Sequence, residues 1–341
     1  MLSHFDCIIQ PFTILIRPMS KPTTFATPLP QSRRSSVLEW RFPKPHHSYV
    51  LTGKSWAAWH TSFVIPQLNL LLDAGLCVNN LRPKHIFITH GHSDHSLLSP
   101  AFVKRDDPPD IFCPLLMTAA LDNFVQAKTV LNYGGHIPDP NAAAGIRPTH
   151  VTHGLQPGDV VPLRRIKGDG NSVTATAFAC HHSVPCLGYV FRKTTRKLRA
   201  QYAKLAGPEI KALRESGIEI TEPVTAPIFA FLGDTTAQTL AAGPSWLDDL
   251  PVVITECSFL YPEHRAQADK TKHTIWEDLE PVIRKRPETT FVLTHFSMRY
   301  TEDQVRIFFR DMADPPQNMV VWVDGDPEVE GPRGSEQCFT R

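Results

Sequence analysis

The sequence THGHSDH at residues 89–95 decides the fold of this chain of 341 residues. It places four side chains that can bind a metal, His90, His92, Asp94 and His95, within six residues. An apolar run directly before it predicts a buried strand. A loop that follows a strand and contains glycine can turn so that the first two histidines face one point and the last two side chains face another. Imidazole and carboxylate ligands in this arrangement suit zinc and similar divalent ions.

A site for two ions needs further ligands, and three later apolar strands end in candidates. The predicted strand 172–179 is followed by His181 and His182, of which one should face inward because side chains alternate along a strand. Asp234 follows the apolar residues FAFL, and a carboxylate at such a strand end can bridge two ions. His295 follows the apolar residues FVLT. Together with the first motif, these residues predict a binuclear metal site.

Hydrophobic patterns predict short strands first, and then strands that alternate with helices in both halves of the chain. This order predicts an α/β fold in which two mixed β-sheets pack between helical layers, an αββα sandwich. The predicted strands are 50–52, 62–65, 68–73, 85–89, 159–163, 172–179, 187–191, 227–232, 252–255, 290–294 and 319–323. The predicted helices are 115–129, 197–216 with a break at Gly207, 274–285 and 302–312.

Composition narrows the class of protein. A hydrophobic share of 42% is enough for a sizeable core, and a net charge of +1 provides no global field toward nucleic acid or a membrane. Any nucleic-acid contact must therefore come from a local basic patch. The 7 cysteines include no C-x-x-C pair, which favours reduced thiols in an intracellular compartment. No segment approaches the ~18 apolar residues that span a bilayer, so we predict no membrane contact.

The chain divides into three predicted parts. Residues 1–40 are predicted to be a disordered tail or a transit peptide, because residues 1–38 contain one acid, Asp6, against four basic residues. Residues 41–325 are predicted to form the globular domain, and residues 326–341 a C-terminal tail. The N-terminal composition indicates a mitochondrion or plastid if it is a transit peptide, and otherwise the cytoplasm or nucleus.

The motif H-x-H-x-D-H is that of the metallo-β-lactamase superfamily, and further segments resemble tRNase Z, the endonuclease that trims the 3′ end of precursor tRNA. The chain therefore resembles a metallo-β-lactamase-fold hydrolase over most of residues 85–300. The first motif is specific to the superfamily, whereas the later segments point to tRNase Z and its close relatives. These segments are HSVPCLGY at 182–189, ECSF at 256–259, HT at 273–274 and HFSMRY at 295–300.

The resemblance implies two divalent metal ions, with zinc expected and manganese or iron also compatible with the ligands. A water held between the ions would lose a proton and attack the phosphorus atom. The implied ligands are His90, His92 and His182 for one ion and Asp94, His95 and His295 for the other, with Asp234 bridging the two.

The resemblance also implies roles for residues around the metal site. Asp94 would orient the attacking water and accept its proton, His273 would protonate the leaving 3′ oxygen, and Glu256 would orient His273. Alternatively, His273 is a surface histidine before a helix, and Glu256 forms a structural salt bridge. Ser297 and Arg299 either hold a substrate phosphate or fix the loop that carries the last metal ligand.

Two regions depart from the tRNase Z pattern. The segment GKSWAAWH at residues 53–60 replaces a glycine-rich strand and turn. Residues 190–232 are too few for a full tRNA-binding arm and too many for a tight hairpin, so we predict a short basic insertion at about 190–226. Its eight Lys and Arg residues outnumber its glutamates. They either follow a phosphate backbone or form a solvated helix face.

Three functions remain open at this point. The first is a tRNase Z-type endoribonuclease that cleaves 3′ trailers of precursor tRNA, for which the resemblance makes a homodimer plausible. The second is a small-molecule hydrolase of the same fold, acting on a cyclic nucleotide, lactone or thioester. The third is an inactive scaffold or RNA-binding partner, and the presence of all seven metal ligands argues against it. An open basic groove near the metals would favour RNA, and a closed apolar pocket a small ligand.

Overall fold

The computed structural model describes residues 37–78, 82–103, 107–132, 134–135, 149–164 and 172–324. The chain divides into two units, Met1–Ser36 and Val37–Arg341, and the fold belongs to the second. Nearly all of the predicted N-terminal tail and the whole predicted C-terminal tail lie outside the described residues. The first strand begins at Leu38, slightly before the predicted boundary at residue 41. No helix in the described part of the chain is long and apolar enough to cross a membrane.

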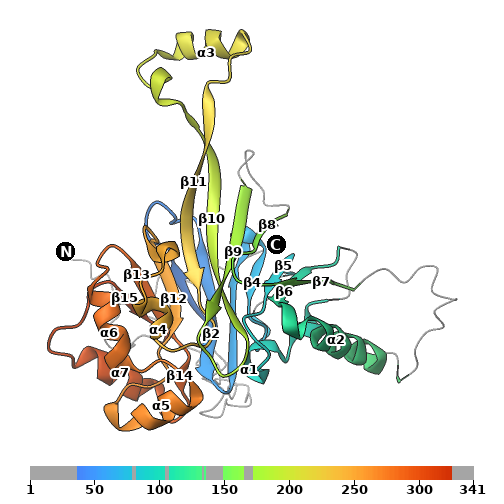
Figure 1. The fold of residues 1–341 in the computed structure, drawn as a ribbon, viewed down its shortest axis with the longest axis vertical. Helices are drawn as coiled ribbons and strands as arrows, with labels where there is room; N and C mark the ends of the chain where they lie inside the picture. The colour runs from blue at the N-terminus through green and yellow to red at the C-terminus, as the bar shows by residue number, and fades with distance from the viewer. Residues whose placement is uncertain are drawn as a thin grey trace, which may run out of the picture. The chain divides into compact units, whose positions relative to one another are not determined.

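Two mixed β-sheets make up the centre of the fold (Figure 1). Each sheet combines an antiparallel part with a parallel part, as predicted. Within the described residues the first sheet has eight strands: β1 (Leu38–Arg41), β2 (Val50–Ala57), β3 (His60–Ile65), β4 (Leu70–Leu72), β5 (His85–Phe87), β6 (Asp110–Pro114), β7 (Val151–Leu155) and, beside β2, β14 (Phe296–Ser297). The second sheet has seven, in the order β15 (Met319–Val321), β13 (Thr290–Thr294), β12 (Val252–Glu256), β11 (Thr221–Phe231), β10 (Cys186–Leu198), β9 (Ser172–Cys180) and β8 (Val160–Leu163).

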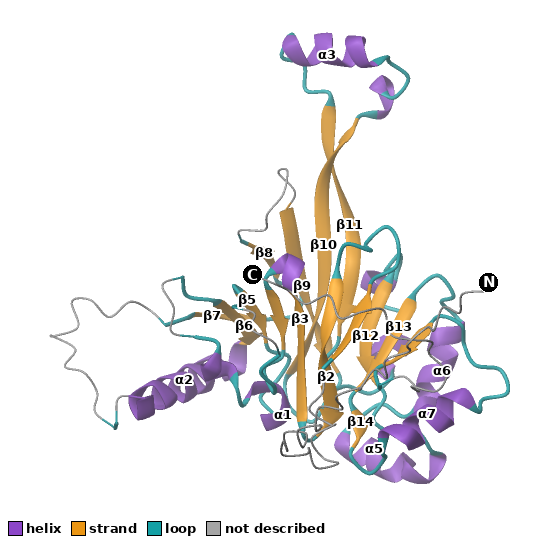
Figure 2. Ribbon diagram, turned by 180° about the vertical axis from the view of Figure 1, so that it is seen from behind, coloured by secondary structure: helices purple, strands orange, loops and turns teal. Residues whose placement is uncertain are grey.

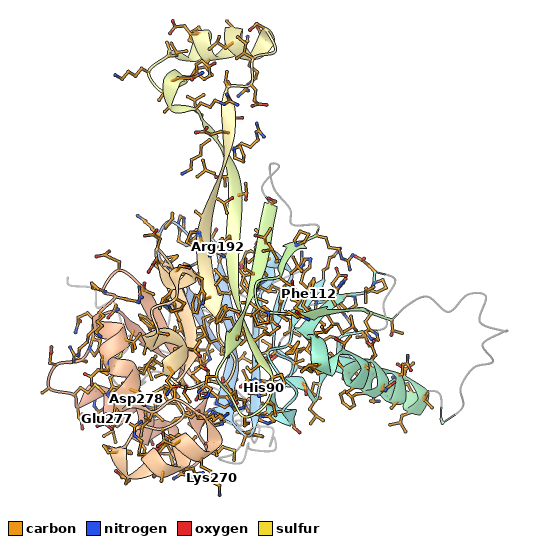
Figure 3. All side chains as sticks on the ribbon, viewed as in Figure 1. His90, Phe112, Arg192, Lys270, Glu277 and Asp278 are labelled. Atoms are coloured by element: carbon orange, nitrogen blue, oxygen red, sulfur yellow. The ribbon has the colours of Figure 1, made fainter. Side chains whose placement is uncertain are left out.

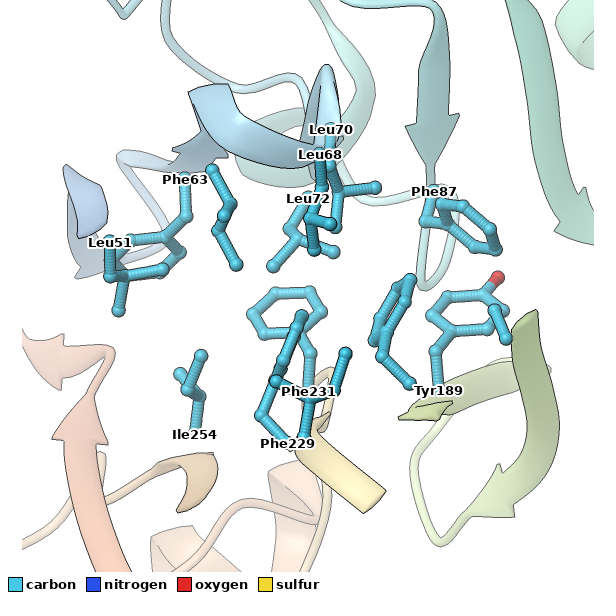
Figure 4. Close-up of a cluster of buried hydrophobic side chains, with 14 of the residues drawn as sticks. Leu51, Phe63, Leu68, Leu70, Leu72, Phe87, Tyr189, Phe229, Phe231 and Ile254 are labelled. Carbon is cyan, nitrogen blue, oxygen red and sulfur yellow. The ribbon is translucent and has the colours of Figure 1, made fainter. Parts of the chain in front are cut away.

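The inner faces of the two sheets share one hydrophobic core. Side chains alternate along each strand, so Ile254 of β12 belongs to this core while its neighbour Val253 packs on the outer face. Figure 4 shows Phe63 of the first sheet and Phe231 of the second pointing into the space between the sheets, and their rings meet edge to face at 6.1 Å. Burial of this apolar surface holds the sheets together and fixes the relative position of their strand ends.

Helices cover the outer faces, which confirms the predicted αββα layers. On the first sheet, α2 buries Leu121 and Val125 against the outward side chains of the strands. On the second sheet, α6 and α7 bury Leu279 and Phe309 in the same way. The described helices are α1 (Ser93–Ser96), α2 (Thr118–Asn132), α3 (Gly207–Glu215), α4 (Gln238–Ala241), α5 (Arg265–Thr271), α6 (Trp276–Arg284) and α7 (Glu302–Arg310).

The basic insertion forms an extended hairpin, which we call the arm (residues 193–225). β10 and β11 remain paired from Tyr189 to Leu198, whereas within the described residues the pairing of β9 with β10 extends to Thr194. Figures 1 and 2 show the two strands continuing past the rest of the sheet, with α3 at their far end. The prediction of a helix over 197–216 is therefore wrong at Lys197 and Leu198, which belong to β10, and the α-helix begins only at Gly207, after a short 3-10 helix at Ala200–Tyr202.

The reason for this difference is cross-strand pairing. The sequence RKTTRKL at 192–198 has β-branched residues at its centre, which favour a strand, and Thr194 pairs with Thr225 through their hydroxyls at 2.7 Å. Such pairing joins residues that are distant in sequence, so the local charge pattern does not reveal it. For the same reason the short strands β1, β6, β7 and β14 escaped prediction.

Candidate metal centre

The candidate metal centre lies where strands of both sheets end. The first motif follows β5, His182 lies in the turn between β9 and β10, and Asp234 and His295 follow β11 and β13. Because β11, β12 and β13 run parallel, their carboxyl ends meet at one edge of the sheet. Figure 3 shows His90 at the end of the sandwich opposite the arm.

His90, His92, His182 and Asp234 form the first group of donor atoms, which all lie within 4.8 Å of one another. His92 Nδ1 is 3.0 Å from His90 Nε2 and 3.3 Å from His182 Nε2. Asp234 Oδ2 lies 3.6 Å from His90 Nε2 and 3.9 Å from His182 Nε2. His182, and not its neighbour His181, belongs to this group.

Asp94, His95, His295 and again Asp234 form the second group. His95 Nε2 and His295 Nε2 are 3.2 Å apart. Asp94 Oδ2 lies 3.4 and 3.2 Å from these two nitrogens, and Asp234 Oδ1 lies 3.3 Å from each. Asp234 thus turns one oxygen to each group, which is the arrangement of a bridging carboxylate.

These separations test whether a metal ion fits. A tetrahedral ion with bonds of about 2.0–2.1 Å to nitrogen and oxygen holds its ligand atoms about 3.3 Å apart. The nitrogen and oxygen atoms of the second group are separated by 3.2–3.4 Å. Three imidazole nitrogens of the first group also converge at 3.0–3.3 Å. The buried groups therefore fit a dinuclear metal site.

The electrostatics of the centre favour the metal-binding form of four ligand side chains, whereas at His95 burial alone would lower the pKa but Asp234 and Asp73 raise it well above the ordinary value. Burial lowers the pKa of His90 and of His182, which leaves both rings as neutral imidazoles at neutral pH. Burial alone would raise the pKa of Asp94 and of Asp234, but the neighbouring histidines hold both well below the usual range. Neutral imidazoles and ionised carboxylates are the species that bind divalent metals.

Each of four imidazole rings is also held from outside the centre through its second nitrogen. Such outer hydrogen bonds fix the tautomer and the orientation of a metal-binding histidine. The pairs are His90 Nδ1 with Thr89 Oγ1 (3.0 Å), His95 Nδ1 with Asp73 Oδ2 (2.7 Å), His182 Nδ1 with the Lys272 carbonyl (3.1 Å) and His295 Nδ1 with Ser258 Oγ (3.0 Å).

Asp73 is a functional residue that the sequence interpretation missed. Its buried carboxylate accepts hydrogen bonds from His95 Nδ1 at 2.7 Å and from the Thr89 backbone N–H at 2.7 Å. The available signal was a carboxylate closing the apolar run NLLLD at 69–73. Gly75 follows at a close approach, where an added Cβ would lie 1.8 Å from the Asp94 carbonyl oxygen. The hydrogen bonds of Asp73 and the close packing of Gly75 therefore hold residues 73–75 against the metal-binding loop at residues 89–95.

We expect the Asp73→Asn variant to bind zinc about 10- to 100-fold more weakly than the wild type. The amide keeps the shape of the carboxylate but loses the charge that faces His95 Nδ1, so the ring is held less firmly. Competition with a chelator measures the affinity, and circular dichroism checks the fold. Asp311→Asn, at an exposed position, is the matched control. Unchanged zinc affinity in folded Asp73→Asn would contradict the assigned role.

The turn between β2 and β3 contacts the centre through its backbone. The Ala58 N–H donates a hydrogen bond to Asp94 Oδ2 at 2.9 Å. Ala58 has φ 58°, in the left-handed region that non-glycine residues adopt rarely. Because a main-chain group makes this contact, the turn can position Asp94 without the glycine-rich sequence of the tRNase Z pattern.

Glu256 and His273 form a pair beside the two metal-binding groups. Glu256 is buried at the end of β12, and its carboxylate accepts hydrogen bonds from the backbone N–H groups of Thr235 at 2.6 Å and Thr274 at 3.0 Å. His273 Nδ1 donates to Glu256 Oε1 at 2.9 Å. Burial alone would lower the pKa of His273, but the charge of Glu256 and this hydrogen bond raise it to about 9. The surface reading of His273 does not fit, since its ring stacks on His295 at 5.5 Å.

Ser297 and Arg299 lie just beyond the centre and contact each other. Arg299 Nε donates to Ser297 Oγ at 3.2 Å, and its Nη2 donates to Gln267 at 2.5 Å. The guanidinium also lies 5.3 Å from the centre of the Phe259 ring. These contacts fix the loop after His295, and a role in holding phosphate stays a prediction.

The other histidines for which the structure gives contacts have partners elsewhere. The exposed His181 ring bonds Thr236 Oγ1 at 2.9 Å, and His85 bonds the Leu68 carbonyl at 3.3 Å. His153 pairs with Asp110 at 3.0 Å on the first sheet. None of these three belongs to a donor group found among the described residues. His136 lies outside the described residues.

The chain is similar in sequence and fold to known metallo-β-lactamase-fold proteins and to tRNase Z enzymes. Residues 73–190 match the metallo-β-lactamase superfamily. The chain is 31% identical to a chloroplastic tRNase Z of Arabidopsis thaliana over 76% of its own length and 70% of that protein. It is 27% identical to a second Arabidopsis thaliana tRNase Z over 80% of the chain and 94% of that protein. The structure of human tRNase Z, short form, aligns with 83% of the chain and 93% of its own, at 16% identity and a TM-score of 0.41.

Proposed function

Because this chain belongs to the tRNase Z family of the metallo-β-lactamase superfamily, we propose that it is a metal-dependent endoribonuclease that removes 3′ trailers from precursor tRNA. The observation that carries the proposal is the pair of buried donor groups joined by Asp234 at the strand ends. The chloroplastic relative supports an organelle as the location of this activity.

In this proposal the two donor groups hold two divalent ions. Bound there, the ions would lower the pKa of a shared water and offset the negative charge that develops on the phosphate. Imidazole and carboxylate ligands suit zinc, and manganese or iron accept them too. The residues that would hold them are His90, His92 and His182 on one side, Asp94, His95 and His295 on the other, and Asp234 between.

The chain's own acids and bases then have distinct tasks. Asp94 orients the attacking water and accepts its proton, and the Ala58 N–H holds its carboxylate in place through Oδ2. His273 carries the proton for the leaving 3′ oxygen on Nε2, because Nδ1 is bonded to Glu256. A pKa raised to about 9 keeps that proton in place at neutral pH, although nearby cations would offset part of the rise. Glu256 orients the ring.

The arm supports an RNA substrate. Between residues 192 and 222 the chain has eight Lys and Arg residues against four Glu. β10 starts at Cys186 beside the centre and runs for 13 residues, so its far end lies roughly 40 Å away along the strand. A basic surface at that distance suits contact with the phosphates of an extended RNA and offers nothing to a small molecule.

The direct test is cleavage of a precursor tRNA with a 3′ trailer by the metal-loaded protein. We expect a product that ends after the discriminator base and a trailer that begins with a 5′-phosphate. If the protein hydrolyses bis(p-nitrophenyl) phosphate but leaves the precursor intact, the tRNA assignment fails and the small-molecule alternative replaces it.

Charge reversal in the arm should separate RNA binding from chemistry. We expect the Lys197→Glu, Lys204→Glu double variant to raise KM for precursor tRNA at least about tenfold and to flatten its salt dependence, because exposed cations near phosphates are lost. Hydrolysis of bis(p-nitrophenyl) phosphate should stay unchanged. The control carries the same charge change at the exposed Lys128 and Lys285. An equal rise of KM in both double variants would rule out a specific role of the arm.

A further inference from the structure

A pocket of about 560 Å³ opens beside the metal centre in the turn that joins β9 and β10. Its volume falls in the range of small-ligand sites. The floor is buried and apolar, formed mainly by Leu155, Cys180, Cys186 and Leu187. None of these side chains has a part in the chemistry proposed above, so the pocket needs an explanation of its own.

The pocket is separated from the metal centre by a single layer of side chains. His182 lines the pocket, and its Nε2 faces His92 Nδ1 at 3.3 Å on the other side. Cys186 also lines the pocket, and its Sγ lies 3.8 Å from His90 Nδ1. A phosphate at the centre and a group in the pocket would therefore belong to one small unit of substrate.

The rim combines an exposed apolar side chain with polar groups. Leu116 is 83% exposed and lines the pocket, so its apolar side chain is open to a ligand. Gln156, His181 and Ser183 place an amide, an imidazole and a hydroxyl on the same rim. An apolar floor and face with a few polar groups at the edge suits a flat ring that has apolar faces and hydrogen-bonding edges.

We propose that this pocket binds the nucleobase of a nucleotide that flanks the scissile phosphate. The inference rests on the proposed function, because a phosphodiester in RNA carries a nucleoside on each side. The face of the base would contact Leu116, and the polar edge of the base would bond the rim groups Gln156, His181 and Ser183. These contacts would hold the adjacent phosphate against the centre. The pocket would thereby set which nucleotides are tolerated next to the cleavage site.

The test is equilibrium binding of small probes to the metal-loaded full chain by calorimetry. We expect adenosine 5′-monophosphate or adenosine 3′-monophosphate to bind about tenfold more tightly than ribose 5-phosphate, which has no base. The tighter of the two nucleotides tells which side of the phosphate the base occupies. Equal affinity of ribose 5-phosphate and both nucleotides would overturn the proposal.

Two variants alter the pocket without touching a metal-binding side chain. Leu116→Ser removes the exposed apolar face, and Ala179→Leu fills the pocket from an exposed position on its wall. Both should abolish most of the preference for the nucleotide while the affinity for inorganic phosphate and the metal content stay unchanged. Leu131→Ser, at a leucine that is 69% exposed on α2 outside the pocket, should change nothing. A nucleotide preference that survives both pocket variants would contradict the assignment.

These measurements also separate the inference from the function on which it rests. Cleavage of precursor tRNA without any preference for a base would leave the function standing and remove the pocket assignment. The protein could instead prefer the nucleotide, lose that preference in both pocket variants and leave precursor tRNA intact. This result would keep the nucleobase site and assign the centre to a smaller nucleotide substrate.

Discussion

The Asp234→Asn variant should lose precursor tRNA cleavage by roughly four orders of magnitude and retain little metal. Among the described residues, Asp234 is the one residue shared by the donor group of His90 and the donor group of His95, with Oδ2 toward His90 and Oδ1 toward His95. An amide has one oxygen and no charge, so it cannot bridge two cations. The variant should therefore bind both metal ions more weakly, and not only one of them.

The measurements are metal content by elemental analysis and single-turnover cleavage of precursor tRNA. Asp269→Asn on α5, whose side chain is 67% exposed, makes the same chemical change away from the centre and should behave as the wild type. Circular dichroism confirms that both variants fold. Full occupancy by two ions together with near-normal cleavage in Asp234→Asn would show that the bridge is not needed.

The second large effect is expected for His273→Ala, which should cleave precursor tRNA about 10²- to 10⁴-fold more slowly with both metal ions still bound. The ring is bonded to Glu256 at 2.9 Å and does not belong to either group that Asp234 joins. Removal of a proton donor slows departure of the 3′ oxygen and leaves the metal-binding side chains unchanged.

The choice of substrate makes this prediction specific. Bis(p-nitrophenyl) phosphate releases a phenolate that needs no proton, so its hydrolysis should fall only slightly in His273→Ala. His153→Ala, in a histidine of the first sheet that pairs with Asp110, serves as the control. If both substrates lose activity to the same extent, His273 supports the structure of the centre and does not act as the proton donor.

The longer helices α2, α6 and α7 and most strands were predictable because their side-chain pattern repeats with the period of the element, whereas the short helices α1, α4 and α5 escaped prediction. The apolar strands FAFL and FVLT lie where predicted, in β11 and β13, and so do helices α2, α6 and α7 to within a few residues. The helix predicted over 197–216 failed at Lys197 and Leu198, because these two residues pair across β10 and β11, and the stretch before Gly207 has only the short 3-10 helix Ala200–Tyr202. Pairing of distant segments leaves little trace in either segment alone.

The sequence by itself determined the fold family and the seven side chains that converge on the centre, from His90 to His295. Four strand ends with such residues in one chain mark metal chemistry, whereas one alone does not, since His181 and Asp73 also follow apolar strands and belong to neither donor group. Only the tertiary structure revealed the support of Asp73 for His95, the Ala58 N–H on Asp94, the extended arm and the pocket beside His182. A ligand carries its chemistry in its own side chain, whereas a supporting contact or a cavity exists only once distant segments pack together.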